Sequence, residues 1–256
     1  MLTKHGSVVD GLRRWGIPCV LMLALAGLQA QTVVRLHGAI TMEKLLSAQR
    51  QALQTQAGVR VELVGNGSGR GLADLSAGLA DVAMIGGSLK GVAEATNKEK
   101  PGSVSIDGMR EIPLAAIKLV VIAHPSAGVK SLTGAQLRDV LSGKAKSWKE
   151  AGGADLPIRL VLPFAGDGAR ISIQESLLKG ADFAKDAILR NSSKDLAVVV
   201  TQVPGACAFL SAKNAEGSGS IIPVAADLAM PMQFIVKGEM APEVKKVVEF
   251  AKTVIK

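Results

Sequence analysis

Segments with the pattern of strands alternate with segments with the pattern of helices along most of this chain. Val59–Val64 is an apolar strand candidate that leads directly into a glycine-rich loop, GNGSGRG at 65–71, and a helical pattern follows. The same order returns at Pro157–Pro163, where the loop AGDGAR at 165–170 opens a second helix. Such alternation is typical of α/β folds with largely parallel sheets. The sequence therefore predicts an α/β fold that contains two similar strand–loop–helix units.

The rest of the chain continues this alternation. We expect one helix over Thr41–Gln56 that stops at Gly58, and a mobile polar loop over Lys90–Gly102. The apolar run in Glu111–His124 is longer than most buried strands, so we expect it to pass from one lobe to another. The other expected elements are strands at 32–36, 81–85, 206–210 and 232–236, and helices through 72–79, 132–141, 173–178, 193–201 and 242–255.

The N-terminus has the pattern of a secretory signal peptide. Three basic residues precede an apolar run at 17–28, and the small residue Ala30 follows. This run is shorter than the roughly 18 residues that a membrane-spanning helix needs, which favours a cleaved signal over an anchor. We expect residues 1–30 to be removed and the remainder to be exported to the periplasm.

Charge and composition argue against two classes of ligand. The formal net charge of +8 falls to +6 when the three bases and one acid of residues 1–30 are removed, and no basic patch stands out. Aromatic residues make up 3% of the chain and Tyr is absent, so few rings could stack on bases or sugars. We expect no nucleic-acid partner.

Once residues 1–30 are removed, Cys207 is the only cysteine left, and its apolar surroundings predict a core residue. We expect no intrachain disulfide.

Both glycine loops have the local chemistry of an anion site. A helix N-terminus carries unpaired N–H donors and the positive end of the helix dipole, and glycine lets a ligand approach the backbone. Ser68 adds a hydroxyl in the first loop, and Thr41 adds another at the head of the first helix. One such loop alone is more often an ordinary capped turn. Two loops of matched design favour a binding site.

The sequence offers no catalytic or metal-binding pattern. A dinucleotide fingerprint would need a small residue where Leu72 stands, and no Gly-Lys-Ser or Gly-Lys-Thr is present. Beyond residue 30 the only histidines are His37 and His124, and no His, Cys or paired carboxylates cluster at ligand spacing. We expect no catalytic residue, no metal and no cofactor. Binding without chemistry is the function class that remains.

Five motifs in order resemble the phosphate-binding proteins of ABC transporters and their solute-binding relatives. The motifs are GNGSGRG with ADVAMIGGSL, LTGAQLRDVLSGKAKSWKEAGG, PIRLVLPFAGDGAR, a Pro-Gly-Ala turn before a strand, and MPMQFIVKG. The resemblance covers nearly the whole chain beyond the signal peptide. It implies a type II periplasmic binding protein fold, in which two α/β lobes joined by two crossings enclose a ligand cleft. The lobes would be residues 31–115 plus 228–256, and residues 116–227.

The resemblance also implies a function and a set of ligand residues. Such a protein binds phosphate or a related oxyanion and delivers it to an ABC permease without catalysing a reaction. We expect a monomer. The ligand residues would be Thr41, Gly67, Ser68, Gly69, Ser88, Asp167, Gly168, Ala169 and Arg170.

The chain departs from the family pattern where the ligand should bind. The second loop of the family usually reads Gly-Ser-Gly-Thr-Arg, whereas Asp167 and Ala169 stand in the hydroxyl positions here. Ile85 replaces a residue that is usually Ser, Asp or Arg. Asp167 could repel a dianion or pair with Arg170. These departures keep open a second function, a sensor or protein-interaction module that retains the fold without phosphate affinity. A phosphate-ester hydrolase is a third alternative, and it lacks a nucleophile.

Overall fold

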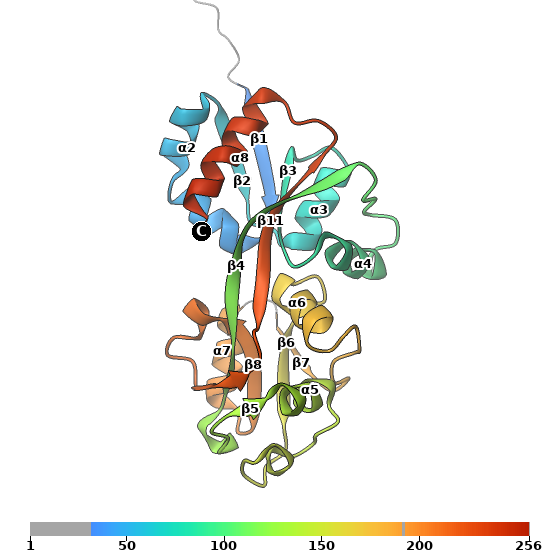
Figure 1. Ribbon diagram of the computed structural model, residues 1–256, viewed down its shortest axis with the longest axis vertical. Coiled ribbons are helices and arrows are strands. Elements are labelled where there is room, and N and C mark those ends of the chain that lie inside the picture. The colour runs from blue at the N-terminus through green and yellow to red at the C-terminus, as the bar shows by residue number, and fades with distance from the viewer. Residues whose placement is uncertain (1–31, 191–192, 256) are drawn as a thin grey trace, which may run out of the picture. The chain divides into compact units, whose positions relative to one another are not determined.

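The computed structural model describes residues 32–190 and 193–255 of the chain (Figure 1). The predicted signal peptide, residues 1–30, lies outside the described residues. Strands and helices alternate along the described chain, which confirms the predicted α/β class.

The strands agree with most of the expected positions, and several are longer. They are β1 (Val33–Gly38), β2 (Arg60–Val64), β3 (Val82–Gly86), β4 (Met109–Ala123), β5 (Leu132–Thr133), β6 (Arg159–Pro163), β7 (Ile188–Arg190), β8 (Ala206–Ser211), β9 (Ser220–Ile222), β10 (Val224–Ala225) and β11 (Ala229–Lys237).

The helices connect these strands. They are α1 (Ile40–Ser47), α2 (Arg50–Ala57), α3 (Ser68–Ser76), α4 (Leu89–Glu99), α5 (Gly134–Ser142), α6 (Gly168–Ser176), α7 (Ser193–Gln202) and α8 (Pro242–Val254), with short 3-10 helices at Pro125–Ala127, Trp148–Ala151 and Ala212–Ala215.

Nine strands of the described chain join one sheet. Their order is β2-β1-β3-β11-β4-β8-β6-β7, and β9 pairs with β4 beside this path. The strands β1, β2 and β3 are parallel to one another, as are β6, β7 and β8. The strands β11 and β4 are antiparallel to each other, and each is antiparallel to its other neighbours. Two parallel groups are thus joined through an antiparallel pair.

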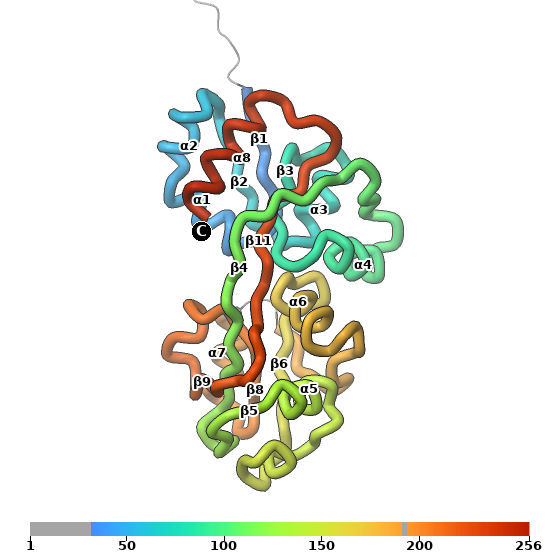
Figure 2. Tube along the Cα trace, viewed as in Figure 1, coloured from blue at the N-terminus to red at the C-terminus, as the bar shows by residue number. Residues whose placement is uncertain are grey.

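The long strand β4 lies in the antiparallel pair that joins the two groups (Figure 2). Its first part, Met109–Lys118, pairs with β11, and its last part, Leu119–Ala123, pairs with β8 and β9. The strand β11 lies beside it and also pairs with β3. One extended strand therefore spans both halves of the sheet, and its expected crossing from one lobe to another stays a prediction.

The apolar core is divided in the same way. Leu36, Met84 and Phe234 are fully buried in a cluster around β1, β3, β11 and α8. Trp148 and Phe209 are buried in another cluster around β6, β8 and the end of β4. Within this division the exact lobe boundaries, 31–115 plus 228–256 and 116–227, stay a prediction.

The predicted polar loop over Lys90–Gly102 is wrong, because most of this segment is the helix α4. The side chain of Ser88 caps the helix by accepting a hydrogen bond from the Gly91 N–H. Leu89 and Val92 have helical spacing and are buried against α3 and β3. The high polar content of the segment is that of an amphipathic surface helix, and this pattern can be mistaken for a loop when only a few apolar residues mark the buried face.

The predicted single helix over Thr41–Gln56 is also wrong in one respect. It divides into α1 and α2, because Gln49 has non-helical backbone angles of φ −116° and ψ 15°. Its predicted stop is confirmed, since Gly58 ends α2 in the left-handed conformation with φ 68°.

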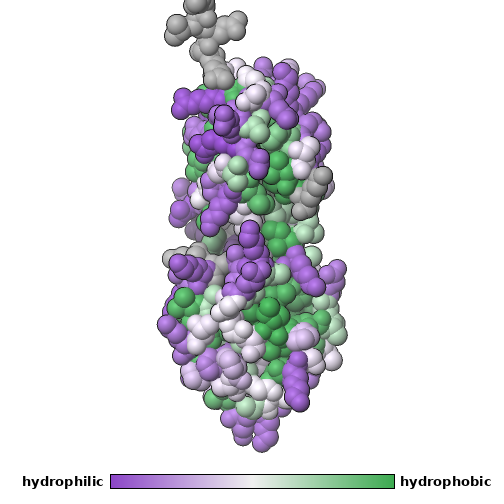
Figure 3. All heavy atoms as spheres, turned by 90° about the vertical axis from the view of Figure 1, so that its left-hand side faces the viewer, coloured by the Kyte–Doolittle hydropathy of each residue, from purple (hydrophilic) through white to green (hydrophobic). Residues whose placement is uncertain are grey.

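No helix in the described part of the chain is long and apolar enough to cross a membrane. On the face shown in Figure 3, hydrophilic residues are interspersed with hydrophobic ones.

Candidate ligand-binding site

Ser68 begins α3 immediately after the first glycine loop. Its side chain is buried, with 5% of the residue exposed, and its Oγ accepts a hydrogen bond of 3.0 Å from the Gly86 N–H. The first helical bond of α3 runs from the Gly71 N–H to the Gly67 carbonyl, so the N–H groups of Ser68, Gly69 and Arg70 have no acceptor within the helix. A buried hydroxyl and free backbone donors thus lie together at this helix end.

The glycines of this loop also allow close packing. Gly67 has φ 95°, which few other residues adopt, and its N–H donates to the Gly38 carbonyl at 2.8 Å. A Cβ at Gly69 would lie 2.5 Å from the Thr96 Oγ1 of α4, and one at Gly71 would overlap the end of β1. Packing of α3 against its neighbours therefore explains Gly69 and Gly71 without a ligand.

A polar network holds the loop from the other side. The Asp74 carboxylate lies 2.8 Å from the His37 Nδ1 and accepts a hydrogen bond of 2.9 Å from the Asn66 Nδ2. His37 is at the end of β1 and Asn66 is in the loop, so this network fixes the approach to α3. The sequence analysis missed it because the partners His37 and Asp74 are far apart along the chain.

The second loop differs from the first, because its own carboxylate binds the helix. The Asp167 Oδ1 accepts hydrogen bonds from the Ala169 N–H at 2.9 Å and the Arg170 N–H at 3.2 Å. Burial raises the pKa of Asp167 above its usual range, against the effect of these two donors and of the Arg170 charge. Two of the predicted N–H donors at the start of α6, those of Ala169 and Arg170, are therefore already bonded to Asp167.

The two strand–loop–helix units meet at Gly86 and Gly168. A Cβ at Gly168 would lie only 2.5 Å from the Gly86 carbonyl group, so no larger residue fits without movement. Beside this contact the Ser88 hydroxyl donates to the Glu175 Oε1 at 2.6 Å. Ile171 of α6 is 3% exposed and packs in the same apolar cluster as the residues around α3 and α4. The first turns of α6 therefore lie directly against the end of β3 and the start of α4.

An aromatic ring lines the space beside Gly67. The Cζ of Phe164 is 3.5 Å from the position a Gly67 Cβ would take, and the ring also lies near Gly166. A phenyl ring supplies no N–H or O–H donor, so this part of the space between the two loops is apolar. The sequence analysis missed Phe164, although its place in PFAGDGAR, at the end of the β6 strand, was the available signal.

Arg170 forms no ion pair with Asp167, which was one of the two alternatives that the sequence left open. Its Nη1 donates to the Pro163 carbonyl at 2.8 Å, and its guanidinium carbon lies 5.4 Å from the centre of the Phe183 ring. In residues 32–190 and 193–255 it has no ion pair. Burial lowers the pKa of Arg170, and the charge of Asp167 opposes this effect.

The remaining candidate positions have local roles. Thr41 is exposed in the first turn of α1, where the preceding Ala39 provides no side-chain cap. Ile85 is fully buried in β3, so the apolar residue at this position contributes to the core. Ser68, Ser88 and Gly168 surround the end of β3, and their role in ligand binding stays a prediction.

Cys207 is fully buried in β8, as the sequence predicts. Burial raises the pKa of its thiol to about 12, so it stays protonated and unreactive at neutral pH. Among the described residues, no three His, Cys, Asp or Glu side chains are grouped so that they could hold a metal ion.

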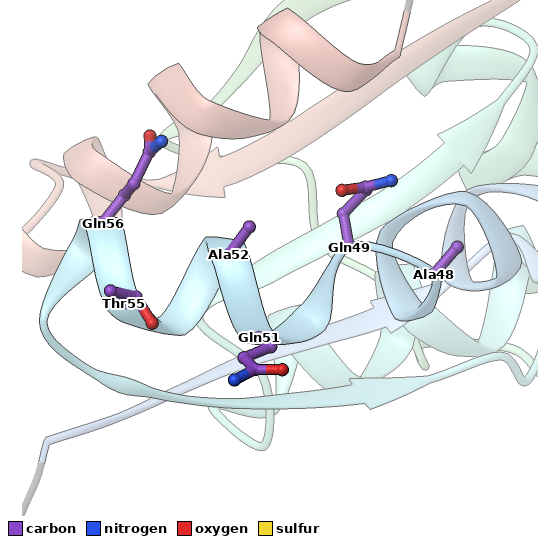
Figure 4. Close-up of a pocket in the computed structure, with 6 residues that line it drawn as sticks. All are labelled: Ala48, Gln49, Gln51, Ala52, Thr55 and Gln56. Carbon is purple, nitrogen blue, oxygen red and sulfur yellow. The ribbon is translucent and has the colours of Figure 1, made fainter.

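A depression of about 510 Å³ lies on the outer surface at α2. Figure 4 shows Gln49, Ala52 and Gln56 on one side of the helix and Gln51 and Thr55 on another, so these side chains do not converge on a common point. None of the lining residues is charged. This surface has no feature of an anion site.

The strand order and the helix ends that meet at Gly86 define a class, the binding proteins with a type II-like periplasmic fold. The sequence profile described as the PBP superfamily domain matches residues 26–248. The chain belongs to this superfamily.

Individual relatives have phosphate-related names. The chain is 27% identical over 184 residues to the phosphate-binding protein PstS of Bacillus subtilis (strain 168). The aligned residues cover 72% of this chain and 58% of that protein. Less than two thirds of that relative is therefore represented in the match.

Two solved structures share the fold. An ABC-type phosphate transport receptor from Vibrio cholerae has 23% identity and a TM-score of 0.69, and the match covers 86% of this chain and 94% of the receptor. A putative phosphate ABC transporter substrate-binding protein with bound phosphate, from Clostridium perfringens, has 22% identity and the same TM-score of 0.69, with 85% and 92% covered. At these identities the similarity shows the fold alone.

Proposed function

We propose that this protein is a periplasmic solute-binding protein that binds phosphate or a related oxyanion and delivers it to an ABC permease. The ligand binds between lobes formed by residues 31–115 plus 228–256 and residues 116–227. Residues 1–30 act as the signal peptide, and the exported protein acts as a monomer without catalytic activity. The names of the relatives, including the B. subtilis PstS, support the ligand class.

The observation that carries this proposal is the buried hydroxyl of Ser68 at the N-terminus of α3. Its oxygen already accepts the Gly86 N–H, so its proton remains to be donated to an anion. The free N–H groups of Ser68, Gly69 and Arg70 add donors at the positive end of the helix dipole. The hydroxyl, the free N–H groups and the helix dipole therefore all favour a negative charge at the N-terminus of α3.

The two loops contribute unequally in this proposal. Asp167 accepts the N–H groups of Ala169 and Arg170 at the start of α6, so α3 supplies most of the hydrogen bonds to the ligand. A hydrogen bond to a charged group contributes about 1.5–3 kcal/mol, so the loss of two such donors weakens binding substantially. We therefore expect a weaker affinity than in a protein whose two loops both donate.

Calorimetry on refolded, ligand-free protein tests the proposal with phosphate, sulfate and molybdate. We expect Ser68→Ala to weaken binding of the preferred oxyanion about 10- to 150-fold, which is the range for one charge-assisted hydrogen bond. Ser76→Ala is the matched control, because Ser76 lies at the other end of α3 and bonds to the Ser105 N–H. The proposal fails if no oxyanion gives heat or if both variants behave alike.

A second function is favoured by Asp167 and Phe164. A carboxylate that caps its own helix and a phenyl ring beside Gly67 both reduce the capacity for a dianion. A sensor or protein-interaction module with this fold would give no heat with any of the three oxyanions. Such a module would also keep its sensing or protein-interaction activity after Ser68→Ala, whereas a transport protein would lose its activity in ligand uptake.

A further inference from the structure

The network of His37, Asp74 and Asn66 contains two buried polar atoms that the proposed function does not explain. In the described part of the chain, the His37 Nε2 and the Asn66 Oδ1 are buried and have no hydrogen-bond partner. His37 lies on β1, and only 11% of its side chain is exposed. A buried polar atom without a partner is costly to stability, so its presence beside the loop of the candidate site calls for a physical reason.

Both ring nitrogens of His37 face carboxylates. The Nδ1 lies 2.8 Å from the Asp74 Oδ2, and the Nε2 lies 3.6 Å from the Glu62 Oε1. A carboxylate only accepts hydrogen bonds, so the Nδ1 carries a hydrogen and donates to Asp74. In the neutral ring the Nε2 is then an acceptor that faces a second acceptor. A proton on the Nε2 turns this contact into an ion pair with Glu62, and loss of that proton restores the conflict.

The other charged groups around His37 are paired or exposed. The charge of His37 also acts on Asp81, but the Asp81 carboxylate already pairs with the Arg35 guanidinium at 3.0 Å. The helices α2 and α8 pack on the opposite face of β1. The remaining charged side chains on the neighbouring elements are exposed or bonded within their own helix, and they are Arg60, Arg70, Lys44 and Glu43. Asp74 and Glu62 are therefore the groups that respond most directly to the charge of His37.

Asp74 connects His37 to the loop before α3. The same Asp74 oxygen that faces the His37 Nδ1 also accepts the Asn66 Nδ2 at 2.9 Å. Asn66 directly precedes Gly67, whose N–H donates to the carbonyl of Gly38, the residue after His37. The loop is thus held from both sides by groups next to His37. When His37 is neutral, the two carboxylates also lose their compensating charge, and a local excess of negative charge disfavours an anion at the nearby helix end.

We propose that His37 is a positioning residue that makes anion binding at α3 dependent on pH. Its protonated ring binds Asp74 and Glu62, offsets their charge and holds the loop 65–67 in place, and loss of the proton weakens anion binding. This role rests on the proposed oxyanion function. Because an imidazole changes its charge between about pH 5 and about pH 8, the affinity for an anion decreases as pH rises through this range. By linkage, binding of the anion takes up protons.

Calorimetry with sulfate tests this role, because sulfate keeps its charge in this range whereas phosphate itself titrates. We expect the sulfate affinity to fall about fivefold or more from about pH 5.5 to about pH 8. Near pH 7 the binding heat should depend on the ionisation enthalpy of the buffer, since protons are taken up. His37→Gln should remove both dependences. His124→Gln is the matched control and should keep both, because the His124 Nδ1 contacts the Ser126 hydroxyl and not a carboxylate.

A second variant covers the case in which His37→Gln fails to fold. The Glu62 side chain is 53% exposed, so Glu62→Gln should fold normally, and it removes the carboxylate that faces the Nε2. The decrease in sulfate affinity should then move to lower pH, whereas Glu239→Gln, a change at another exposed glutamate, should not move it. A pH-independent sulfate affinity in the unmodified protein would refute the role of His37. Equal pH profiles of the two glutamine variants would refute it as well.

A measurement without ligand separates this role from the proposed function. The side-chain amide resonances of Asn66, followed by NMR, should shift between about pH 5.5 and about pH 8 in the unmodified protein, and this shift should disappear in His37→Gln. If no oxyanion binds at any pH while the Asn66 amide still shifts, the oxyanion function fails and the coupling of His37 to the loop stands. If oxyanions bind and the Asn66 amide does not respond to pH, the function stands and the coupling fails.

Discussion

Replacing Gly168 with alanine tests the close contact between α6 and β3. The new Cβ would lie 2.5 Å from the carbonyl group of Gly86, whereas ordinary contact begins at 3.4 Å. The two backbones must therefore separate by about 0.9 Å, or the start of α6 must rotate. Backbone atoms cannot move aside as a flexible side chain can, so we expect the strain to affect the whole contact.

Two opposing effects set the size of the change. Alanine favours a helix over glycine by up to about 1 kcal/mol, less at the first position of a helix. Overpacking of a well-packed contact is destabilising by about 1–3 kcal/mol. Overpacking is the larger effect here, and we expect Gly168→Ala to lower the free energy of unfolding by about 1–2 kcal/mol. The nearby bond from Ser88 to Glu175 should weaken with it.

Urea unfolding followed by tryptophan fluorescence measures this change, because Trp148 is fully buried. A loss of this size lowers the midpoint by about 0.5–1 M for an m-value near 2 kcal/mol per M. Gly166→Ala is the matched control in the same loop, since its Cβ would lie 3.4 Å from the edge of the Phe164 ring, which can move. The reasoning is refuted if the two variants have the same midpoint, or if Gly168→Ala is the more stable.

Two further predictions concern titratable groups. Because burial raises the pKa of Asp167, its ionised form is less favourable in the folded than in the unfolded protein, and stability decreases as pH rises through its usual range toward the raised value. The difference in stability between Asp167→Asn and the unmodified protein, measured by urea unfolding, should therefore shift in favour of the variant from about pH 3 to about pH 7. An equal difference at the two pH values would contradict this. Cys207, with a pKa of about 12, should react with a thiol reagent only at the rate of unfolding, and prompt reaction in the native protein would show an accessible thiol.

Much of the fold could be predicted because it depends on local patterns. The alternation of apolar strands and amphipathic helices, the glycine at the end of α2 and the long run of β4 are all visible in short windows of sequence. The error at α4 has the same origin, since only a few apolar residues such as Leu89 and Val92 mark its buried face.

The candidate site was less predictable. The pairing of His37 with Asp74, the packing of Phe164 on Gly67 and the approach of Gly168 to Gly86 all join residues that are distant in the chain. No local pattern reports such contacts, because they depend on how strands and helices are placed in three dimensions.

The sequence by itself determined the α/β class, the positions of both glycine loops and the types of group at their helix ends, because backbone conformation and capping depend on near neighbours. Only the tertiary structure decided how those groups are used. The two loops have similar sequences but different hydrogen bonds, because Ser68 accepts the Gly86 N–H of a neighbouring strand while Asp167 accepts an N–H of its own helix. The side chain of Arg170 is fixed by its bond to the Pro163 carbonyl and by the ring of Phe183, contacts that no local pattern reports, and its role at the ligand stays a prediction.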